Sequence, residues 1–284
     1  MSNITRRDFA QLTAAAAAFP AFAAIDSKFS GVMIGAQTYS FRDLPSLDDG
    51  IAAMKKIGLG YAELWEGQIV PKDRSQVAAW RSNPPMDELR GLRKKFDEAG
   101  IDLYAFNYSF RDDFNDQQIE QGFLMAKAMG VTRITASSNV DVSPRVDKFA
   151  EQYKIYVGYH NHDSMKPNEF STPDDWKQAL AGRSKYTGIN LDIGHFTAAN
   201  FDPVSFLEEH HAKILTLHIK DRKKDHGPNM PLGEGDTNIK GVLEVLKTKK
   251  YLIPAMIEYE YGKPGLDTVA EVKKCFDYCK AALA

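Results

Sequence analysis

The chain has 284 residues, of which 43% are apolar, and its formal net charge is −2. This length allows one large α/β domain or two small ones, and the balanced charge argues against a polyphosphate-binding surface and therefore against a nucleic-acid partner. Cys275 and Cys279 are the only cysteines. Their spacing within a helical pattern indicates packing in a helix, and the sequence excludes a framework of several disulfides.

The first 23 residues have the features of an export signal. Arg6 and Arg7 precede an alanine-rich apolar run, and a small-x-small pattern follows at residues 21–23. This order of features predicts a signal peptide over residues 1–23, and the paired arginines indicate the type handled by the twin-arginine export machinery. The apolar run is shorter than the ~20 residues that a spanning helix needs. We therefore expect a periplasmic or otherwise exported protein without stable membrane insertion.

Beyond residue 23, strand-like and helix-like patterns alternate with a period of about 30 residues. In the first half, Ser46 is expected to cap a helix that ends at Gly58, and a polar stretch containing Pro71, Pro84 and Pro85 is predicted to be a loop. Strands are predicted at 32–39, 61–65, 101–108 and 131–136, and helices at 46–57, 86–99, 116–129 and 143–153.

The alternation continues through the second half. Strands are predicted at 155–160, 187–193, 214–219 and 253–259, and helices at 172–180, 203–211, 239–247 and 266–283. Strict alternation indicates parallel strands with crossover helices, and a count of eight predicts one domain over residues 24–284, a closed (β/α)8 TIM barrel. An open doubly wound sheet would have a glycine-rich first turn, and residues 39–43 contain no glycine.

Groups suited to metal binding lie at the predicted ends of the last four strands. They are the imidazoles and carboxylates within residues 160–163, 192–195, 218–221 and 258–260, and they include His160, Asp192, His218 and Glu258. A TIM barrel carries its chemistry at these strand ends, and buried polar groups are costly unless they are paired or bound to a metal. Nitrogen and carboxylate ligands from four strands suit one divalent ion, such as Mn²⁺, Zn²⁺, Co²⁺ or Fe²⁺.

Other strand-end residues are candidates for catalysis or substrate binding. His160 or His162 is expected to act as the base, because an imidazole titrates near neutral pH without much tuning. Lys220 and Glu63 are candidates for orienting hydroxyl groups or supplying a proton. Trp65 has the ring needed to stack on a sugar, although packing is an alternative explanation for its position.

Four strand-end segments carry a family resemblance. GYHNHD (158–163), NLDIGH (190–195), LHIKD (217–221) and IEYE (257–260) resemble the xylose-isomerase-like barrel superfamily, and within it the sugar phosphate isomerase/epimerase family. The resemblance implies a metal held by Asp192, His218 and Glu258, with His160 in a place that is usually glutamate. It also implies that His195 contacts the substrate and that Glu258 takes part in proton transfer.

This resemblance implies a metal-dependent carbohydrate isomerase or epimerase that removes a proton next to the carbonyl of a sugar or keto-sugar. Because His160 replaces a glutamate, a lyase or dehydratase acting on a 3-keto-glycoside or polyol is the alternative. Export favours an unphosphorylated substrate. Two alternatives belong to other functional classes: a non-catalytic carbohydrate-binding barrel and a nuclease related to endonuclease IV. The net charge and the export signal disfavour the nuclease. A homo-oligomer is compatible with the sequence.

Overall fold

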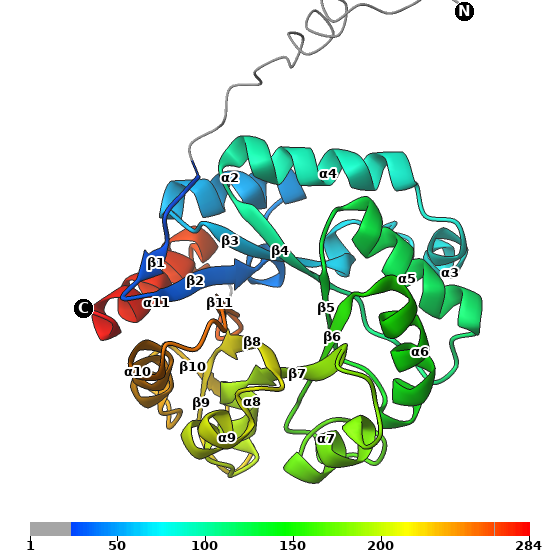
Figure 1. The fold of residues 1–284 in the computed structure, drawn as a ribbon. Helices are drawn as coiled ribbons and strands as arrows, with labels where there is room; N and C mark the ends of the chain where they lie inside the picture. Colours follow the sequence, from blue (N-terminus) through cyan, green and yellow to red (C-terminus); the bar gives the residue numbers. More distant parts are fainter. Residues whose placement is uncertain (1–23, 264) are drawn as a thin grey trace, which may run out of the picture.

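The computed structural model describes residues 24–263 and 265–284 and consists of a barrel of strands surrounded by helices (Figure 1). The predicted signal peptide at residues 1–23 lies outside the described residues. The barrel strands are β2 (Val32–Gln37), β3 (Tyr61–Trp65), β4 (Asp102–Asn107), β5 (Arg133–Ala136), β6 (Tyr156–His160), β7 (Thr187–Asp192), β8 (Ile214–Ile219) and β11 (Ala255–Ile257). Neighbouring strands pair in parallel, and the pairings of β2 with β3 and with β11 close the ring. The predicted (β/α)8 barrel is confirmed.

Helices cover the outside of this ring (Figure 1). They are α2 (Leu47–Ile57), α3 (Arg74–Ser82), α4 (Met86–Ala99), α5 (Asp116–Ala128), α6 (Ser143–Tyr153), α7 (Pro173–Leu180), α8 (Ile193–Ala198), α9 (Pro203–His210), α10 (Ile239–Lys249) and α11 (Thr268–Ala282). Helix α2 begins and ends as predicted. The Ser46 hydroxyl accepts from the Asp49 N–H (3.2 Å), and Gly58 ends the helix with a φ of 95°, in the left-handed region that glycine adopts most easily.

Short elements extend this frame at its edges. Strand β1 (Lys28–Phe29) pairs antiparallel with β2, and Figure 1 shows it beside α11. The Phe29 and Phe276 rings lie 5.6 Å apart, and the Ser30 hydroxyl donates to the Leu283 carbonyl (2.8 Å). These contacts fasten the start of the described chain to its last helix.

Two helices differ from the sequence prediction. Helix α3 lies within the predicted proline-containing loop, and none of its side chains is buried. It is held by the side chain of Arg81, which makes two hydrogen bonds to Glu66 (2.7 and 2.5 Å). Helix α8 begins directly after β7, where the Asp192 carboxylate accepts from the His195 N–H (2.7 Å). The chain therefore turns into a helix at the point where a strand was predicted to continue.

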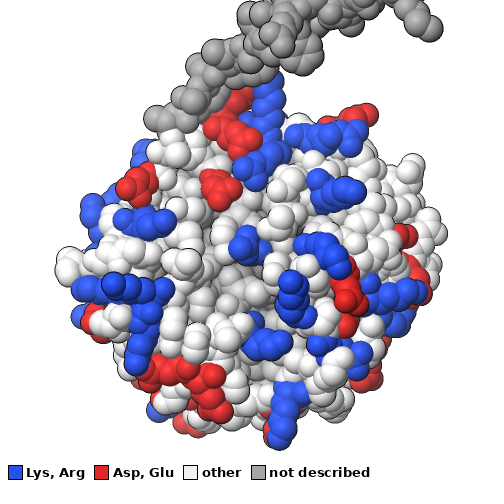
Figure 2. Space-filling model, in the orientation of Figure 1, with Lys and Arg blue, Asp and Glu red and all other residues white. Residues whose placement is uncertain are grey.

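Within the described residues, no helix combines the length and the apolar character needed to cross a bilayer. On the face of the molecule drawn in Figure 2, basic and acidic side chains are mixed and separated by uncharged surface. The absence of a nucleic-acid partner remains a prediction from the sequence.

The glycine-rich segment before α10 is organised by one buried carboxylate. Asp221 accepts from the backbone N–H groups of Gly233 (2.8 Å), Gly235 (2.9 Å) and Thr237 (3.1 Å). A Cβ at Gly235 would collide with the Asp221 side chain, so a glycine is required there. The segment between β8 and α10 is thus folded around Asp221.

Asp221→Ala is expected to lower the free energy of unfolding by about 3 kcal/mol, because it leaves three backbone donors without their charged acceptor. Urea denaturation would measure this loss, and Asp221→Asn should lose less because it keeps one acceptor oxygen. A loss below about 1 kcal/mol would mean that water replaces the carboxylate.

Candidate functional site

The four predicted metal ligands come together in the structure. His160 is the last residue of β6, Asp192 is the last residue of β7, His218 lies in β8, and Glu258 follows β11. These four strands are consecutive around the barrel. One ligand atom from each residue lies within 4.8 Å of the ligand atoms of the other three, and all four residues are buried.

Three of these four residues leave a buried polar atom without a hydrogen-bond partner. The atoms are Asp192 Oδ2, His218 Nδ1 and Glu258 Oε2. Although His218 Nδ1 and Glu258 Oε2 are only 2.9 Å apart, they do not have hydrogen-bond geometry. A buried polar group without a partner costs about 1–3 kcal/mol. One divalent ion would satisfy all three atoms, so the residues present fit a metal.

Groups behind the ligands fix the orientation of the two imidazoles. His160 Nδ1 lies 2.9 Å from the Asn190 side-chain oxygen, which orients this imidazole so that Nε2 is its free nitrogen. His218 Nε2 lies 3.0 and 3.1 Å from the two oxygens of Glu63. A carboxylate behind a metal-binding histidine fixes the ring and raises its basicity. Both histidines are thus set up as ligands.

Glu63 lies behind His218 and does not line the cavity. It is fully buried, and the side chains of Gln37 and Thr135 both donate to Glu63 Oε1 at 2.6 Å. This position gives no support to the predicted contact between Glu63 and substrate. It makes Glu63 a positioning residue for His218.

Burial and neighbouring charges shift the histidine pKa values in opposite directions. Burial lowers the pKa of His160 well below its usual value, and the nearby His218 and His162 lower it further. Burial also lowers the pKa of His218, but the carboxylates of Glu63 and Glu258 outweigh that effect and raise it well above the usual value. His160 is therefore neutral, whereas His218 holds a proton that a bound metal ion would displace.

Lys220 is buried among the carboxylates of the site. Its ammonium lies 3.1 Å from Asp192 Oδ2, 3.1 Å from Glu258 Oε2 and 2.7 Å from Glu260 Oε2. Burial lowers the pKa of this amine, but the three carboxylates outweigh burial and raise it above the usual value. Lys220 therefore stays charged and is a poor proton donor. It can act as a fixed counter-charge for the carboxylates.

His195 bridges Lys220 and a second charged group. Its Nε2 lies 3.0 Å from the Lys220 ammonium, and its Nδ1 lies 3.3 Å from Asp163 and 2.7 Å from Arg222. Lysine and arginine are obligatory donors, and a neutral imidazole has one acceptor nitrogen. His195 therefore accepts a hydrogen bond from only one of these two cations at a time. The tautomer with Nδ1–H toward Asp163 leaves Nε2 as the acceptor.

A cavity of about 360 Å³ opens above the metal-type residues. Trp65 and Tyr39 lie in its wall as an edge-to-face pair with centroids 4.8 Å apart. His162 also faces the cavity, and its imidazole has no hydrogen-bond partner among the described residues. Burial, with His195 and Lys220 nearby, lowers the pKa of His162 to about 4. His162 is thus a neutral imidazole that is free to contact a ligand.

The cavity walls also contain polar residues that the sequence prediction did not single out. They are Gln37, Asn107, Ser109, Arg111, Ser137 and Glu260. Gln37 and Asn107 are the last residues of β2 and β4. The prediction considered histidine and acidic residues at strand ends and passed over amides and hydroxyls. Attention to every polar strand-end residue would have found Gln37 and Asn107.

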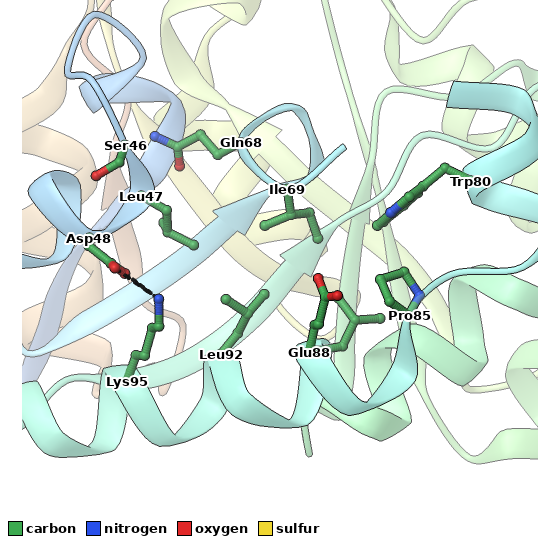
Figure 3. A pocket seen from close by; sticks show the side chains of 11 residues that line it. Ser46, Leu47, Asp48, Gln68, Ile69, Trp80, Pro85, Glu88, Leu92 and Lys95 are labelled. Atoms are coloured by element: carbon green, nitrogen blue, oxygen red, sulfur yellow. Dashed lines mark hydrogen bonds and ion pairs between the residues drawn. The ribbon is translucent and has the colours of Figure 1, made fainter. Parts of the chain in front are cut away.

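A second hollow lies outside the barrel, among α2, α3 and α4. Its volume is about 260 Å³, and Leu92 on α4 lies opposite Leu47 and Ile69, with Trp80 and Pro85 at one end (Figure 3). Lys95 pairs with Asp48 (2.7 Å). The groups of histidine and acidic residues that could hold an ion within the described chain lie in the barrel mouth, so the first cavity is the candidate functional site.

A curated relative matches part of the chain. Over 93 residues the chain is 34% identical to the L-ribulose-5-phosphate 3-epimerase UlaE of Escherichia coli. This match covers 33% of the chain and 32% of the relative. The chain thus aligns with about a third of the length of the curated relatives that it matches.

Solved structures share the fold over nearly their whole length. The zinc-bound IOLI protein is 16% identical with a TM-score of 0.68, covering 89% of this chain and 98% of that chain. The 3-keto-D-glucoside 4-epimerase YcjR from E. coli is 13% identical with a TM-score of 0.66, covering 88% of this chain and 99% of that chain. At these identities the likeness establishes the fold alone.

The family described as xylose isomerase-like TIM barrel matches residues 51–279. This range begins in α2 and ends in α11, so it includes all barrel strands except β2. The curated relative that aligns with a third of the chain is an epimerase. The chain belongs to the xylose isomerase-like TIM barrel family.

Proposed function

We propose that the protein is a metal-dependent enzyme that removes a proton next to the carbonyl of a sugar or keto-sugar. The observation that carries this proposal is the set of three buried atoms on Asp192, His218 and Glu258 that make no hydrogen bond, although Lys220 is ion-paired with the two carboxylates. With His160 they would hold one Mn²⁺, Zn²⁺, Co²⁺ or Fe²⁺ ion. Such an ion would supply Lewis-acid stabilisation of the charge that develops on the carbonyl oxygen.

The chain's own residues divide the remaining tasks. His162 accepts the substrate proton on an imidazole nitrogen, because it faces the cavity and has no described protein partner. Burial lowers its pKa to about 4, below the near-neutral value expected from the sequence, so it is a weaker base than a free imidazole. The Trp65 ring packs on the sugar, and the His195 imidazole contacts it from the cavity wall. Lys220 keeps the site carboxylates in place instead of donating a proton. The prediction of His160 and Glu258 as catalytic groups becomes, in this proposal, a role as metal ligands.

Elimination from a 3-keto-glycoside is the second candidate reaction. His160 stands where a glutamate is usual in the family that the sequence resembles, so the site lacks the pair of glutamates that returns a proton to the opposite face of a sugar. A single base suits elimination, in which the proton leaves and is not returned. The fold neighbour that is a 3-keto-D-glucoside 4-epimerase supports trying 3-keto-glycosides.

His162→Gln is expected to slow exchange of the substrate proton by about 10²- to 10⁴-fold without changing metal content, because glutamine cannot accept the proton. The assay follows deuterium uptake from D₂O into ketoses and 3-keto-glucosides by NMR, and release of the aglycone would identify elimination. The paired variant His160→Gln should lose both metal and exchange. If His162→Gln exchanges at the wild-type rate, another group is the base.

Elemental analysis tests the proposal as a whole. About one bound transition metal per chain, together with proton exchange, is the expected result. Protein that stays metal-free after reconstitution and binds sugar without exchange would instead be a non-catalytic carbohydrate-binding barrel.

We also propose export of the mature protein through the twin-arginine machinery. The support is the arginine pair and apolar run within residues 1–23. Replacing Arg6 and Arg7 together by lysine should leave the protein in the cytoplasmic fraction, whereas unchanged release would contradict this route.

A further inference from the structure

One wall of the cavity consists of donors that have no protein partner within the described chain. Ser109, Ser137 and Arg111 line the cavity. No described carboxylate lies within ion-pair distance of Arg111, and neither hydroxyl hydrogen-bonds to another described residue. An arginine has five donors in a planar fork, so this wall presents unused donors and a positive charge to whatever occupies the cavity.

The backbone at Arg111 is held in place, although the side chain of this residue is exposed. It is held because the residues around Arg111 are hydrogen-bonded to the loop that follows β5. Beyond the last paired residues of β4 and β5, the two segments continue side by side. Three hydrogen bonds join them: Tyr108 N to Thr135 O (2.9 Å), Phe110 N to Ser138 Oγ (2.9 Å) and Asp112 N to Asn139 Oδ1 (3.3 Å). Residues 108–112 therefore form a braced arm.

Side chains on this arm alternate between the core and the cavity. Tyr108 and Phe110 are fully buried, with their rings 5.2 Å apart. Asn107, Ser109 and Arg111 all line the cavity. This period of two is that of an extended strand, and it commits Arg111 to the cavity side. The packing of the two aromatic rings thus fixes the backbone from which the Arg111 side chain extends.

The other wall has the opposite character. Glu258 and Glu260 bring carboxylates to the cavity beside His160, His162 and His195. A substrate with its carbonyl at this end would extend toward Arg111. The planar fork of an arginine matches a carboxylate or a phosphate in two parallel hydrogen bonds.

We propose that Arg111, with Ser109 and Ser137, is an anion-binding subsite, and that the substrate is a keto-sugar with a carboxylate or a phosphate at the end remote from the carbonyl. This inference rests on the proposed function only for the placement of the carbonyl at the metal end. The subsite itself consists of residues that hold no metal.

Three matched ketoses test the subsite: D-fructose, D-fructuronate and D-fructose 6-phosphate, which differ only at carbon 6. Their binding is measured by calorimetry with metal-loaded and with EDTA-treated protein. Wild-type protein is expected to bind one of the two anionic sugars about tenfold or more tightly than fructose. The preferred anion identifies a carboxylate or a phosphate as the natural group.

Arg111→Gln should abolish this preference and leave fructose binding unchanged, and Arg111→Lys should retain part of it because lysine keeps the charge but loses the fork. Arg90→Gln is the matched control, since Arg90 lies on α4 with a side chain that is 58% exposed and paired with Asp87. This control removes the same charge away from the cavity and should preserve the preference.

Two results with wild-type protein would overturn the subsite: equal binding of all three sugars, or failure of both anionic sugars to bind. Two results with the variants would also overturn it: an equal loss of binding of all three sugars in Arg111→Gln, or a loss of the anion preference in Arg90→Gln as large as that in Arg111→Gln. Metal content is measured separately on the same samples. If the protein cannot hold metal but still prefers the anionic sugars, the proposed function is refuted and the subsite is kept. If the protein holds metal but has no anion preference, the subsite is refuted and the proposed function is kept.

Discussion

Asp192→Asn is expected to remove the bound metal and to lower activity by about a thousandfold while the fold persists. Asp192 Oδ2 has no hydrogen-bond partner, whereas Oδ1 accepts from the His195 N–H at the start of α8. Asparagine keeps that acceptor but lacks the charge that divalent ions prefer in an oxygen ligand. Losing the metal would remove several kcal/mol of transition-state stabilisation.

Elemental analysis and the D₂O exchange assay measure the two losses in Asp192→Asn. Asp174→Asn is the control, because Asp174 is an exposed residue in the first turn of α7. Glu258→Gln, which changes a residue after a second strand, should show the same loss of metal and activity. A folding defect in one of the two variants then does not decide whether these residues hold the metal. Wild-type metal content in either site variant would contradict the four-ligand centre.

Lys220→Met is expected to destabilise the metal-free protein by about 3–5 kcal/mol. The ammonium lies within 3.1 Å of carboxylate oxygens of Asp192, Glu258 and Glu260, and methionine fills the space of the stem without the charge. Carboxylates that lose their buried counter-charge are strongly unfavourable. Added metal should restore much of the stability, because it supplies positive charge to Asp192 and Glu258.

Urea denaturation in EDTA and in excess Mn²⁺ separates these two effects of Lys220→Met. The control is Lys95→Met, which removes an exposed partner of Asp48 and should cost less than about 1 kcal/mol in both conditions. A loss in Lys220→Met that is equally large with and without metal would show that the ion does not share the charges of Asp192 and Glu258.

The barrel could be predicted from the sequence because its local signals agree with its global pattern. Apolar strands alternate with amphipathic helices, and ends such as Ser46 and Gly58 are marked by capping residues. The sequence pattern did not predict helix α3, which buries no side chain, or helix α8, whose six residues are all buried. Helix α8 is buried on all sides and so lacks a one-sided apolar pattern, and α3 lies in a polar stretch between Pro71 and Pro84.

The meeting of the four metal-type residues could be predicted because they belong to consecutive strands. His160, Asp192, His218 and Glu258 need only parallel neighbours to meet, and parallel order follows from the alternation. The role of Glu63 could not be predicted, because it reaches His218 across the barrel interior over 155 residues of sequence. Local patterns carry no information on which side chains meet across a closed ring.

Two sets of cavity residues come from different parts of the chain. Its metal-type groups come from residues 160–258, whereas the wall with the unused donors comes from residues 107–137. The two sets are therefore separable in the gene. A crossover in α6 (Ser143–Tyr153) would exchange the wall at residues 107–137 together with Glu63, which positions His218, so the incoming half-barrel must supply its own carboxylate behind that histidine.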